Sequence, residues 1–150
     1  MAGVVALVVL TSAACGGVDV PETSVSAAGR EACESVVKAL PERVADQSRR
    51  ETSGNPLGAA WGDPPIVLRC GVGTPAGYDK LASCQTINDL DWFVPEKMIA
   101  DQEADVVMTT IGRKPAVEVK VPASYRPPDA VLVDVSSAIK QHTKVTRRCS

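Results

Sequence analysis

Residues 117 to 121 read Val117-Glu118-Val119-Lys120-Val121, an alternation of apolar and charged side chains. Successive side chains of a β-strand point to opposite faces of the sheet, so this period of two predicts a strand with one buried and one solvated face. The segment Asp105 to Ile111 has the same strand character, and Gly112-Arg113-Lys114-Pro115 between the two is a turn sequence. The stretch therefore predicts a β-hairpin over residues 105–121 whose valines face the core.

Further strands are predicted upstream of this hairpin. Ile66 to Cys70 is a β-branched run that ends at the Gly- and Pro-rich breaker Gly71 to Gly77. A second hairpin fits Gln85 to Ile87 and Asp91 to Val94. The two arms are joined through Asn88-Asp89, where asparagine tolerates the left-handed backbone angles that tight hairpin turns need.

Helical periodicity appears on both sides of the strands. Five apolar residues recur at helical spacing near the N-terminus: Cys33, Val36, Val37, Leu40 and Val44. Because proline interrupts a helix, Pro41 predicts a helix that ends near Leu40, with a short helical continuation through Val44. Polar residues 47–55 predict a loop. Residues 131–139 fit a C-terminal amphipathic helix, and an extended segment 131–133 followed by a helix after Asp134 fits equally well.

The predicted elements and the composition together define the fold class. One N-terminal helix, about five mostly antiparallel strands and a C-terminal helix indicate an α+β fold rather than repeated βαβ units. The chain has 150 residues, enough for one domain with a sizeable core, which we place at residues 31–150. Hydrophobic residues make up 45% and the net charge is -2, so the sequence does not resemble a nucleic-acid-binding or disordered protein.

The first residues have the pattern of an export signal. Gly3 to Leu10 is an apolar run followed by small residues, as in a secretory signal peptide, and it is too short to span a bilayer. Ser12-Ala13-Ala14-Cys15 resembles a bacterial lipobox, in which the cysteine receives a diacylglycerol and becomes the first residue of the mature chain. We therefore expect a signal peptide at residues 1–14 and lipidation at Cys15, with the protein anchored to the extracytoplasmic side of the cell membrane.

Two features depart from the lipobox pattern and leave alternatives open. Ser12 stands where leucine is usual, and no Lys or Arg precedes the apolar run. The alternatives are an ordinary secretory signal cut elsewhere, or an uncleaved anchor lengthened by residues upstream of Met1. Residues 15–30 consist largely of Gly, Ser, Thr, Pro and Ala, a composition that predicts a lipidated tether rather than packed structure.

Four cysteines remain once Cys15 is assigned to the lipid: Cys33, Cys70, Cys84 and Cys149. An even number of cysteines in an exported chain implies disulfides, and four cysteines allow three pairings. Cys33 lies on the apolar face of the first helix and Cys70 on the inward face of its strand, so both are expected to face one core. Zinc sites need closer cysteine pairs than this chain contains, and we expect no metal site.

The most distinctive string of the chain is Ala60-Trp61-Gly62-Asp63-Pro64-Pro65-Ile66-Val67-Leu68-Arg69-Cys70-Gly71-Val72. It resembles the signature of an actinobacterial envelope family, domain of unknown function 3515. Further blocks resemble that family in the same order: Asp91-Trp92-Phe93-Val94, Thr109-Thr110-Ile111-Gly112-Arg113 and Val117-Glu118-Val119-Lys120-Val121-Pro122. The resemblance covers roughly residues 32–139 and implies a small secreted or membrane-tethered domain without an assigned activity.

The resemblance also bears on the cysteine pairing. Many members of the family start with a transmembrane anchor, lack counterparts of Cys84 and Cys149, and carry the other pair alone. The family therefore implies the pairs Cys33–Cys70 and Cys84–Cys149.

No combination of residues has the pattern of a catalytic site. The only histidine is His142, in a basic C-terminal segment with Lys140, Lys144, Arg147 and Arg148. We therefore interpret the protein as a non-catalytic envelope lipoprotein, an interaction or structural module at the outer face of the cytoplasmic membrane. Its expected partner is an envelope protein or a wall polymer, with no cofactor and no nucleic acid.

The alternative is a domain that binds a small ligand or a wall polymer through the Gly-rich turn and the tryptophan-bearing hairpin. Residues proposed for a ligand or partner surface are Trp61, Asp63, Trp92 and Arg113. Trp92 and Phe93 are neighbours on opposite strand faces, so one is expected in the core; the other is a candidate for exposure or packs beneath the segment of Trp61.

An enzyme would have to depend on carboxylates such as Asp63, Asp91 or Glu118. A pocket with converging polar groups would favour ligand binding or catalysis, whereas a filled core without a pocket would favour a protein interaction.

Overall fold

The structure, a computed structural model, describes residues 16–79 and 81–149. Its centre is an eight-stranded antiparallel sheet. In spatial order the strands are β2 (Arg43–Val44), β3 (Gln47–Arg50), β5 (Gly58–Trp61), β6 (Ile66–Val72), β11 (Ala116–Val121), β9 (Val106–Thr110), β8 (Leu90–Phe93) and β7 (Gln85–Ile87). The fold class is the expected α+β, but the sheet has eight strands rather than about five.

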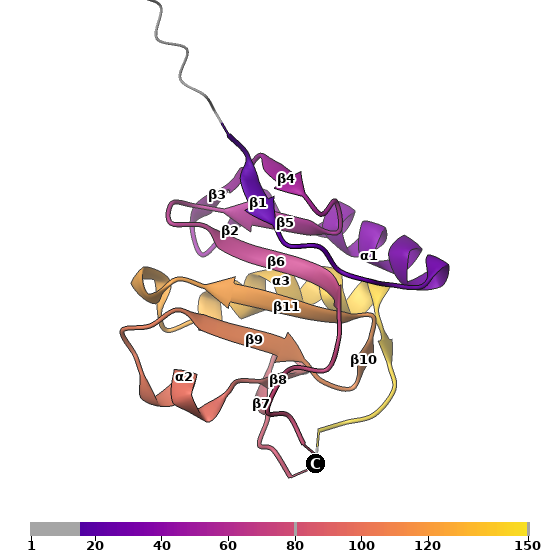
Figure 1. Cartoon of the computed structure of the whole chain (residues 1–150), viewed down its shortest axis with the longest axis vertical. Coiled ribbons are helices and arrows are strands. Elements are labelled where there is room, and N and C mark those ends of the chain that lie inside the picture. Colours follow the sequence, from indigo (N-terminus) through magenta and orange to yellow (C-terminus); the bar gives the residue numbers. More distant parts are fainter. Residues whose placement is uncertain (1–15, 80, 150) are drawn as a thin grey trace, which may run out of the picture.

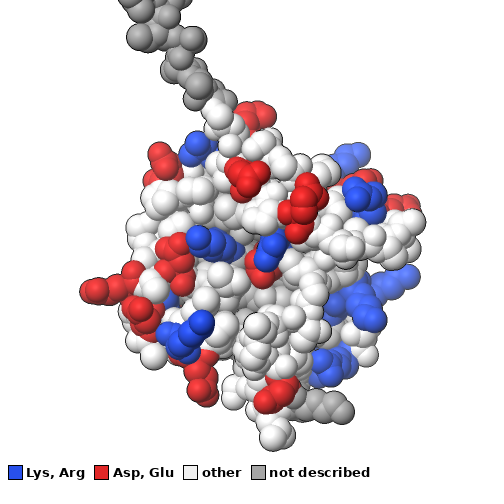
Figure 2. All heavy atoms as spheres, viewed as in Figure 1, with Lys and Arg blue, Asp and Glu red and all other residues white. Residues whose placement is uncertain are grey.

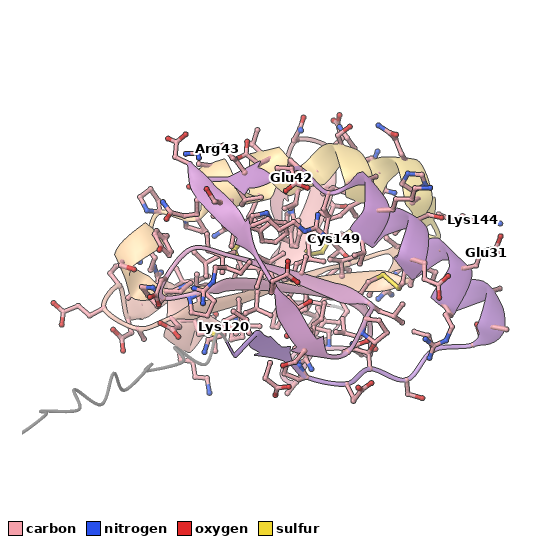
Figure 3. All side chains as sticks on the ribbon, turned by 90° about the horizontal axis from the view of Figure 1, so that it is seen from above. Glu31, Glu42, Arg43, Lys120, Lys144 and Cys149 are labelled. Carbon is pink, nitrogen blue, oxygen red and sulfur yellow. A yellow bond between two sulfur atoms is a disulfide. The ribbon has the colours of Figure 1, made fainter. Side chains whose placement is uncertain are left out.

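The remaining elements surround this sheet. Helices α1 (Ala27–Ala39) and α3 (Asp129–His142) lie side by side on one of its faces (Figures 1 and 3). Two small two-stranded sheets lie at the periphery: parallel β1 (Val18–Val20) with β4 (Thr52–Gly54), and antiparallel β10 (Arg113–Lys114) with β12 (Lys144–Val145). A short helix α2 (Glu96–Ala100) and a 3-10 turn η1 (Ala123–Tyr125) complete the described part of the chain.

The hairpin predicted from the alternating segment lies at the centre of the sheet. β11 pairs with β9 in the register Glu118↔Thr109, and with β6 on its other side. The three valines of β11 are fully buried in the core that α1 and α3 cover, whereas Lys120 is exposed on the other face. The predicted hairpin and the predicted buried face are therefore confirmed.

The interpretation of residues 43–55 from sequence is wrong. No helix continues through Val44, because Ala45 and Asp46 adopt φ angles of 45° and 62° and turn β2 into β3 as a hairpin. Residues 47–54 form strands β3 and β4 rather than a loop, and β5 pairs with β3 and β6. Sequence patterns did not indicate these strands, since polar side chains dominate β3 and β4 and small ones dominate β5.

Residues 17–30 are packed structure rather than a tether. β1 pairs with β4, and Val20 at its end is 1% exposed. The hydroxyl of Thr23 donates a 2.9 Å hydrogen bond to the carbonyl oxygen of Cys70, and α1 already begins at Ala27. Main-chain hydrogen bonds and one buried valine hold this segment, contacts that its composition does not reveal. The packed part of the chain thus begins before the expected boundary at residue 31, and α1 is not its first element.

Both disulfides join the pairs that the family resemblance implied. Cys33–Cys70 links α1 to β6 across a Cα–Cα distance of 5.4 Å, and both residues are fully buried. Cys84–Cys149 links the segment before β7 to the C-terminal segment across 6.2 Å, and both residues are partly exposed. The first disulfide therefore lies inside the core, and the second holds the end of the chain to the edge of the sheet.

The C-terminal helix is continuous. α3 includes residues 131–133, so the extended alternative for this segment is wrong. Its buried side chains face α1 and the sheet: Val131, Leu132, Val135, Ser136, Ala138 and Ile139. The chain leaves α3 at Thr143 and then pairs with β10 as β12.

Candidate functional site

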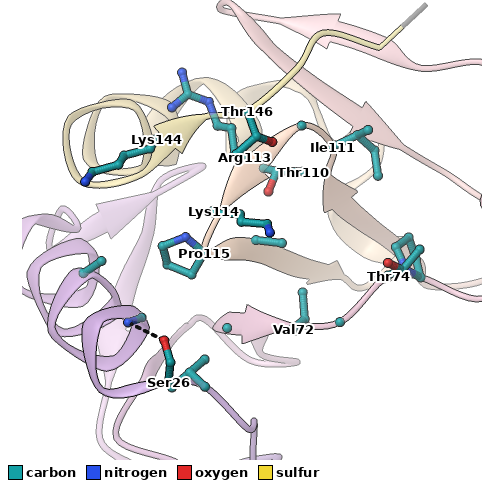
Figure 4. A pocket seen from close by; sticks show the side chains of 18 of the residues that line it. Ser26, Val72, Thr74, Thr110, Ile111, Arg113, Lys114, Pro115, Lys144 and Thr146 are labelled. Carbon is teal, nitrogen blue, oxygen red and sulfur yellow. Dashed lines mark hydrogen bonds between the residues drawn. The ribbon is translucent and has the colours of Figure 1, made fainter.

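A cleft of about 790 Å³ lies where the end of β6 meets the beginning of α1 (Figure 4). Its walls come from four segments: the start of α1, the turn after β6, the turn from β9 to β10, and the C-terminal segment with β12. In Figure 4 the labelled residues Ser26, Val72, Lys114 and Lys144 represent these segments and surround a common space. Segments far apart in sequence therefore build one site.

Positive charge dominates the lining of this cleft. Arg113, Lys114, Lys144 and Arg147 form part of its walls together with His142, and no Asp or Glu is among the described residues that line it. Figure 2 shows a group of Lys and Arg side chains on the right-hand side of the molecule without an acidic side chain among them. Because the whole chain has a net charge of -2, this is a local concentration of positive charge, which attracts anions.

The small β10–β12 sheet positions three of these cations. Arg113 is paired with Val145, and Lys114 is paired directly with Lys144. Nη1 of Arg113 also donates to the carbonyl and hydroxyl oxygens of Thr143, each at 3.0 Å. The pairing therefore brings the backbones of Lys114 and Lys144 side by side, and both exposed side chains add positive charge to the cleft wall.

Arg147 is held against Tyr78 from another wall. Its guanidinium lies 5.6 Å from the ring centroid and Nη2 donates to the Tyr78 hydroxyl at 3.2 Å, while that ring packs edge-on against Phe93. The carbonyl oxygen of Gly112 accepts the N–H groups of Thr146 and Arg147 at 2.7 and 3.3 Å. Gly112 has a φ of 70°, and a Cβ there would lie 2.1 Å from the Arg147 carbonyl oxygen, so this close approach requires glycine.

Asp91 in β8 fixes the end of the C-terminal segment. Its carboxylate accepts the Cys149 amide at 3.0 Å and the Thr86 hydroxyl at 2.7 Å. Burial raises the pKa of Asp91, but these hydrogen bonds and the charges of Arg148 and Arg113 outweigh it, so the pKa lies below its ordinary value of 3.8. Asp91 is therefore ionised at neutral pH and lies beside a cation of the cleft.

Burial and then the neighbouring charge of Arg148 lower the pKa of Arg113, an effect that Asp91 opposes. Arginine nonetheless remains protonated in proteins, so Arg113 keeps its charge.

The remaining walls are made of small residues. Ala28, Gly29 and Ala32 of α1 face the cleft, and Ser26 Oγ caps the helix by accepting the Gly29 N–H at 3.2 Å (dashed line in Figure 4). Near the end of β6, Gly71 has a φ of 87°, and a Cβ there would lie 2.1 Å from a methyl of Val25. The Gly-rich segment of the ligand-binding interpretation therefore forms one wall, and Gly71 allows Val25 to pack closely against it.

The residues proposed from sequence as a ligand or partner surface do not come together. Arg113 lines the cleft, whereas Asp63 lies exposed in the turn between β5 and β6. Trp61 and Trp92 are both 0% exposed, and Phe93 is 6% exposed, so of the two alternatives for the second aromatic residue of β8 the exposed one is wrong. The chain has few aromatic residues, and the core takes both tryptophans because each buries a large apolar area.

Sequence reasoning missed the partners of Arg113. It placed Lys144 and Arg147 in a basic C-terminal segment and did not connect that segment with Arg113 and Lys114. The signal that could have made this connection is Cys149, because a disulfide at this position ties the basic segment back to the sheet.

The candidate catalytic carboxylates in strands make other contacts and do not line the cleft. Asp91 holds the C-terminal segment, and Glu118 Oε1 accepts from Arg69 Nε at 2.7 Å. Glu118 borders a second cavity of about 800 Å³ on the outer face of the sheet. There, the Arg69–Glu118 and Lys120–Asp105 pairs match cations with anions, so this cavity lacks the charge excess of the cleft.

Within residues 16–79 and 81–149, no three His, Cys, Asp or Glu side chains are grouped in a way that could hold a metal ion. In the same part of the chain, no helix has both the length and the apolar character needed to cross a membrane. The two disulfides indicate an oxidising location outside the cytoplasm. Cys15 and the expected signal peptide 1–14 lie outside the described residues.

Comparison with known proteins gives one result. The family model described as Protein of unknown function (DUF3515) matches residues 1–147. The chain belongs to this family. The match is wider than the roughly 32–139 suggested by the sequence blocks, and it includes the cleft of this DUF3515 domain up to Arg147. Searches of curated proteins and of solved structures find no match. The function of the DUF3515 domain must therefore be argued from the cleft itself.

Proposed function

We propose that this DUF3515 domain is a non-catalytic binding module of the cell envelope, and that its basic cleft takes the anionic groups of a wall polymer. The main support is the convergence of Arg113, Lys114, Lys144 and Arg147 on a cleft that no described Asp or Glu lines. Ligand sites are concave and combine small or apolar walls with a few converging polar groups, as this cleft does. A binding role therefore accounts for the cleft better than a purely structural or protein-interaction role.

The two cleft lysines support an anionic ligand. Lys114 and Lys144 come from paired strands, and each ammonium group can donate charge-assisted hydrogen bonds to a phosphate or carboxylate. The three ion pairs found in the described part of the chain use the cations Arg69, Lys120 and Lys140. Both cleft lysines can therefore contact a ligand without breaking any of these pairs.

The number of cations favours a polymer over a single small anion. One phosphate group carries at most two negative charges, whereas four permanent cations line the cleft. A chain with repeating phosphate groups can place more than one of them among these side chains, and each arginine can bind a phosphate with two parallel hydrogen bonds. We therefore propose a phosphate-bearing envelope polymer as the ligand.

We also propose that the protein is a lipoprotein of an actinobacterial envelope, anchored by a diacylglycerol at Cys15. The apolar run Gly3 to Leu10, the small residues before Cys15 and the resemblance of the family blocks support this placement. Intact-mass measurement of the membrane-bound protein is expected to show an acylated N-terminal cysteine, and Cys15→Ala should release or misprocess the protein. A free, unacylated N-terminus in the wild type would refute the anchor.

Titration calorimetry of the purified protein in neutral detergent tests the ligand. The probes are sodium polyphosphate as phosphate polymer, poly-glutamate as carboxylate polymer and dextran as neutral polymer. We expect polyphosphate to bind and dextran not to bind, with an affinity that falls as salt is added because screening weakens exposed charge interactions. Binding of poly-glutamate alone would instead assign the cleft to a polycarboxylate.

A matched pair of variants locates the binding. Lys114→Glu with Lys144→Glu reverses the charge in the cleft, and Lys38→Glu with Lys97→Glu makes the same net change at exposed positions outside it. The first double variant should weaken polyphosphate binding at least about tenfold, which corresponds to about 1.4 kcal/mol. The second should leave it almost unchanged. Equal losses in both variants, or no binding by the wild type, would exclude the cleft as the ligand site.

A further inference from the structure

We propose that the Cys84–Cys149 disulfide is a redox switch for the cleft, and that its reduction by a thiol reductant releases one wall and weakens anion binding. The wall in question is the C-terminal strap, defined as residues 144–149. The ligand part of this inference rests on the proposed function, whereas release of the strap can be measured without any ligand.

The strap supplies much of the cleft but little to the core. It carries two of the four cations, Lys144 and Arg147, together with Thr146 on the same wall. From Lys144 to Arg148 every residue is exposed, including Val145 at 54%. Segments with few buried apolar contacts open locally at low free energy. The strap therefore depends on specific hydrogen bonds and on the disulfide rather than on packing.

Those hydrogen bonds are few. β12 pairs with the two residues of β10, the Gly112 carbonyl accepts two strap amides, and Asp91 accepts the Cys149 amide. The exposed side chains of Arg147 and Arg148 add one hydrogen bond each, to the Tyr78 hydroxyl at 3.2 Å and to the Asp89 carbonyl oxygen at 3.4 Å. The covalent bond at Cys149 is thus the contact whose loss most increases the freedom of the strap.

The disulfide joins two walls of the cleft, not one. Cys84 ends the segment that follows β6, which contributes Thr74, Pro75 and Tyr78 to the lining. Arg147 of the strap lies over the Tyr78 ring. Breaking the Cys84–Cys149 bond therefore loosens both the strap and the segment that carries its aromatic partner, which separates the cations at the mouth of the cleft.

The two disulfides differ in accessibility, and this makes a selective switch possible. Cys33 and Cys70 are each 0% exposed, whereas Cys84 and Cys149 are partly exposed. Thiol–disulfide exchange requires a thiolate to reach a sulfur atom, so access decides which bond reacts first. A dithiol reductant gives two electrons to the Cys84–Cys149 bond and becomes a disulfide, while the two cysteines take up one proton each as thiols. Oxidation reverses these steps.

Hydrogen–deuterium exchange of the whole protein tests strap release. The protein is treated with increasing concentrations of a dithiol, and alkylation with mass spectrometry identifies which cysteines have been reduced. We expect Cys84 and Cys149 to be alkylated before Cys33 and Cys70. In that state the amides of Thr146, Arg147 and Cys149 should exchange faster by an order of magnitude or more, while core amides of β6 and β11 stay protected. Unchanged exchange in the strap would overturn the proposal.

Polyphosphate titration of reduced samples that have not been alkylated tests the effect on the cleft. The dissociation constant should rise on the order of tenfold on reduction and recover on reoxidation. The variant Cys84→Ser with Cys149→Ser should behave like the reduced wild type and no longer respond to the dithiol, which separates the strap disulfide from the buried one. Faster exchange with an unchanged dissociation constant would overturn the switch. Failure of the oxidised wild type to bind polyphosphate would instead overturn the proposed function. The exchange experiment uses no ligand, so it still tests release of the strap in that case.

Discussion

The main-chain amide of Cys149 donates a 3.0 Å hydrogen bond to Asp91 Oδ2, although the two residues are 58 positions apart. The same carboxylate accepts the hydroxyl of Thr86 at 2.7 Å and lies in the field of Arg148 and Arg113. One acidic side chain in β8 therefore fixes the end of the strap and lies close to a cation of the cleft. Ionisation of Asp91 and order in the strap are coupled through this contact.

This coupling predicts a pH dependence of stability. The pKa of Asp91 is held below its ordinary value of 3.8, so its ionised form stabilises the folded state. That contribution is complete above about pH 4, the region of the unfolded-state pKa, and is lost as the pH falls through the lower folded-state pKa. Denaturant unfolding of the wild type and of Asp91→Asn should therefore differ most at neutral pH and converge as the pH falls through the folded-state pKa of Asp91. A difference that is constant over this range would contradict the coupling.

Gly112 predicts a second effect on the strap. Gly112→Ala places a methyl group 2.1 Å from the Arg147 carbonyl oxygen at a φ of 70°, so the strap must shift and the backbone becomes strained. We expect a loss of about 1–3 kcal/mol in thermal unfolding and faster exchange of the Thr146 amide. The matched control is Gly73→Ala, since a Cβ at that cleft residue meets no atom within 4 Å. Equal stability of the two variants would show that the strap does not pass Gly112 so closely.

The central hairpin predicts opposite outcomes for two neighbouring residues. Val119 is 0% exposed, so Val119→Asp buries a carboxylate without a partner and should cost about 3 kcal/mol or more. Lys120→Glu loses only an ion pair with Asp105 whose side chains are about half exposed, and should cost less than about 1 kcal/mol. Denaturant midpoints measure the difference. Similar midpoints would mean that the faces of β11 are reversed.

The two disulfides predict a ranking of stability losses. Cys33–Cys70 and Cys84–Cys149 close loops with sequence separations of 37 and 65, for which chain entropy gives about 3–4.5 kcal/mol each. Replacing Cys33 and Cys70 by serine also places two hydroxyls in the core, at an additional cost of about 1–3 kcal/mol each where they lack partners. The Cys33→Ser, Cys70→Ser variant should therefore unfold at the lower temperature. The reverse order would indicate that the strap contributes more to global stability than its exposure implies.

The elements that sequence predicted well are those whose burial follows a simple period. β11 alternates strictly, and the β7–β8 turn uses Asn88 and Asp89 at φ angles of 50° and 65°, as its residue types indicate. The apolar and β-branched run from Ile66 to Cys70 correctly predicted β6 and its buried face, which consists of Ile66, Leu68 and Cys70. In each case the tertiary environment agrees with the local preference, so the secondary structure could be predicted from the local sequence.

The first third of the fold could not be predicted in this way. β3 and β4 are polar strands, and the turn at Ala45-Asp46 lacks the Asn-Gly or Asp-Gly signal that usually marks such hairpins. β1 pairs with β4, whose polar sequence does not indicate a strand. These elements depend on one another through long-range hydrogen bonds, which no local pattern encodes.

The candidate site was predicted only in part for the same reason. Arg113 was singled out, but its role depends on Lys144 and Arg147, which the strap brings back from the end of the chain. The tryptophans were proposed for the surface because aromatic residues often bind ligands. The core needed their large apolar area, and both are fully buried.

The strand β1 also limits how the protein can be arranged at a bilayer. β1 begins at Val18, and an extended chain spans at most about 3.6 Å per residue, so Val18 stays within roughly 11 Å of Cys15. A lipid on Cys15 would then hold the edge formed by β1 and β4 close to the lipid headgroups, with only a short linker between them. Figure 1 places the start of β1 and the C-terminus at opposite ends of the molecule. The C-terminal end of the strap would then lie on the side of the domain that faces away from the membrane, where a wall polymer could reach it.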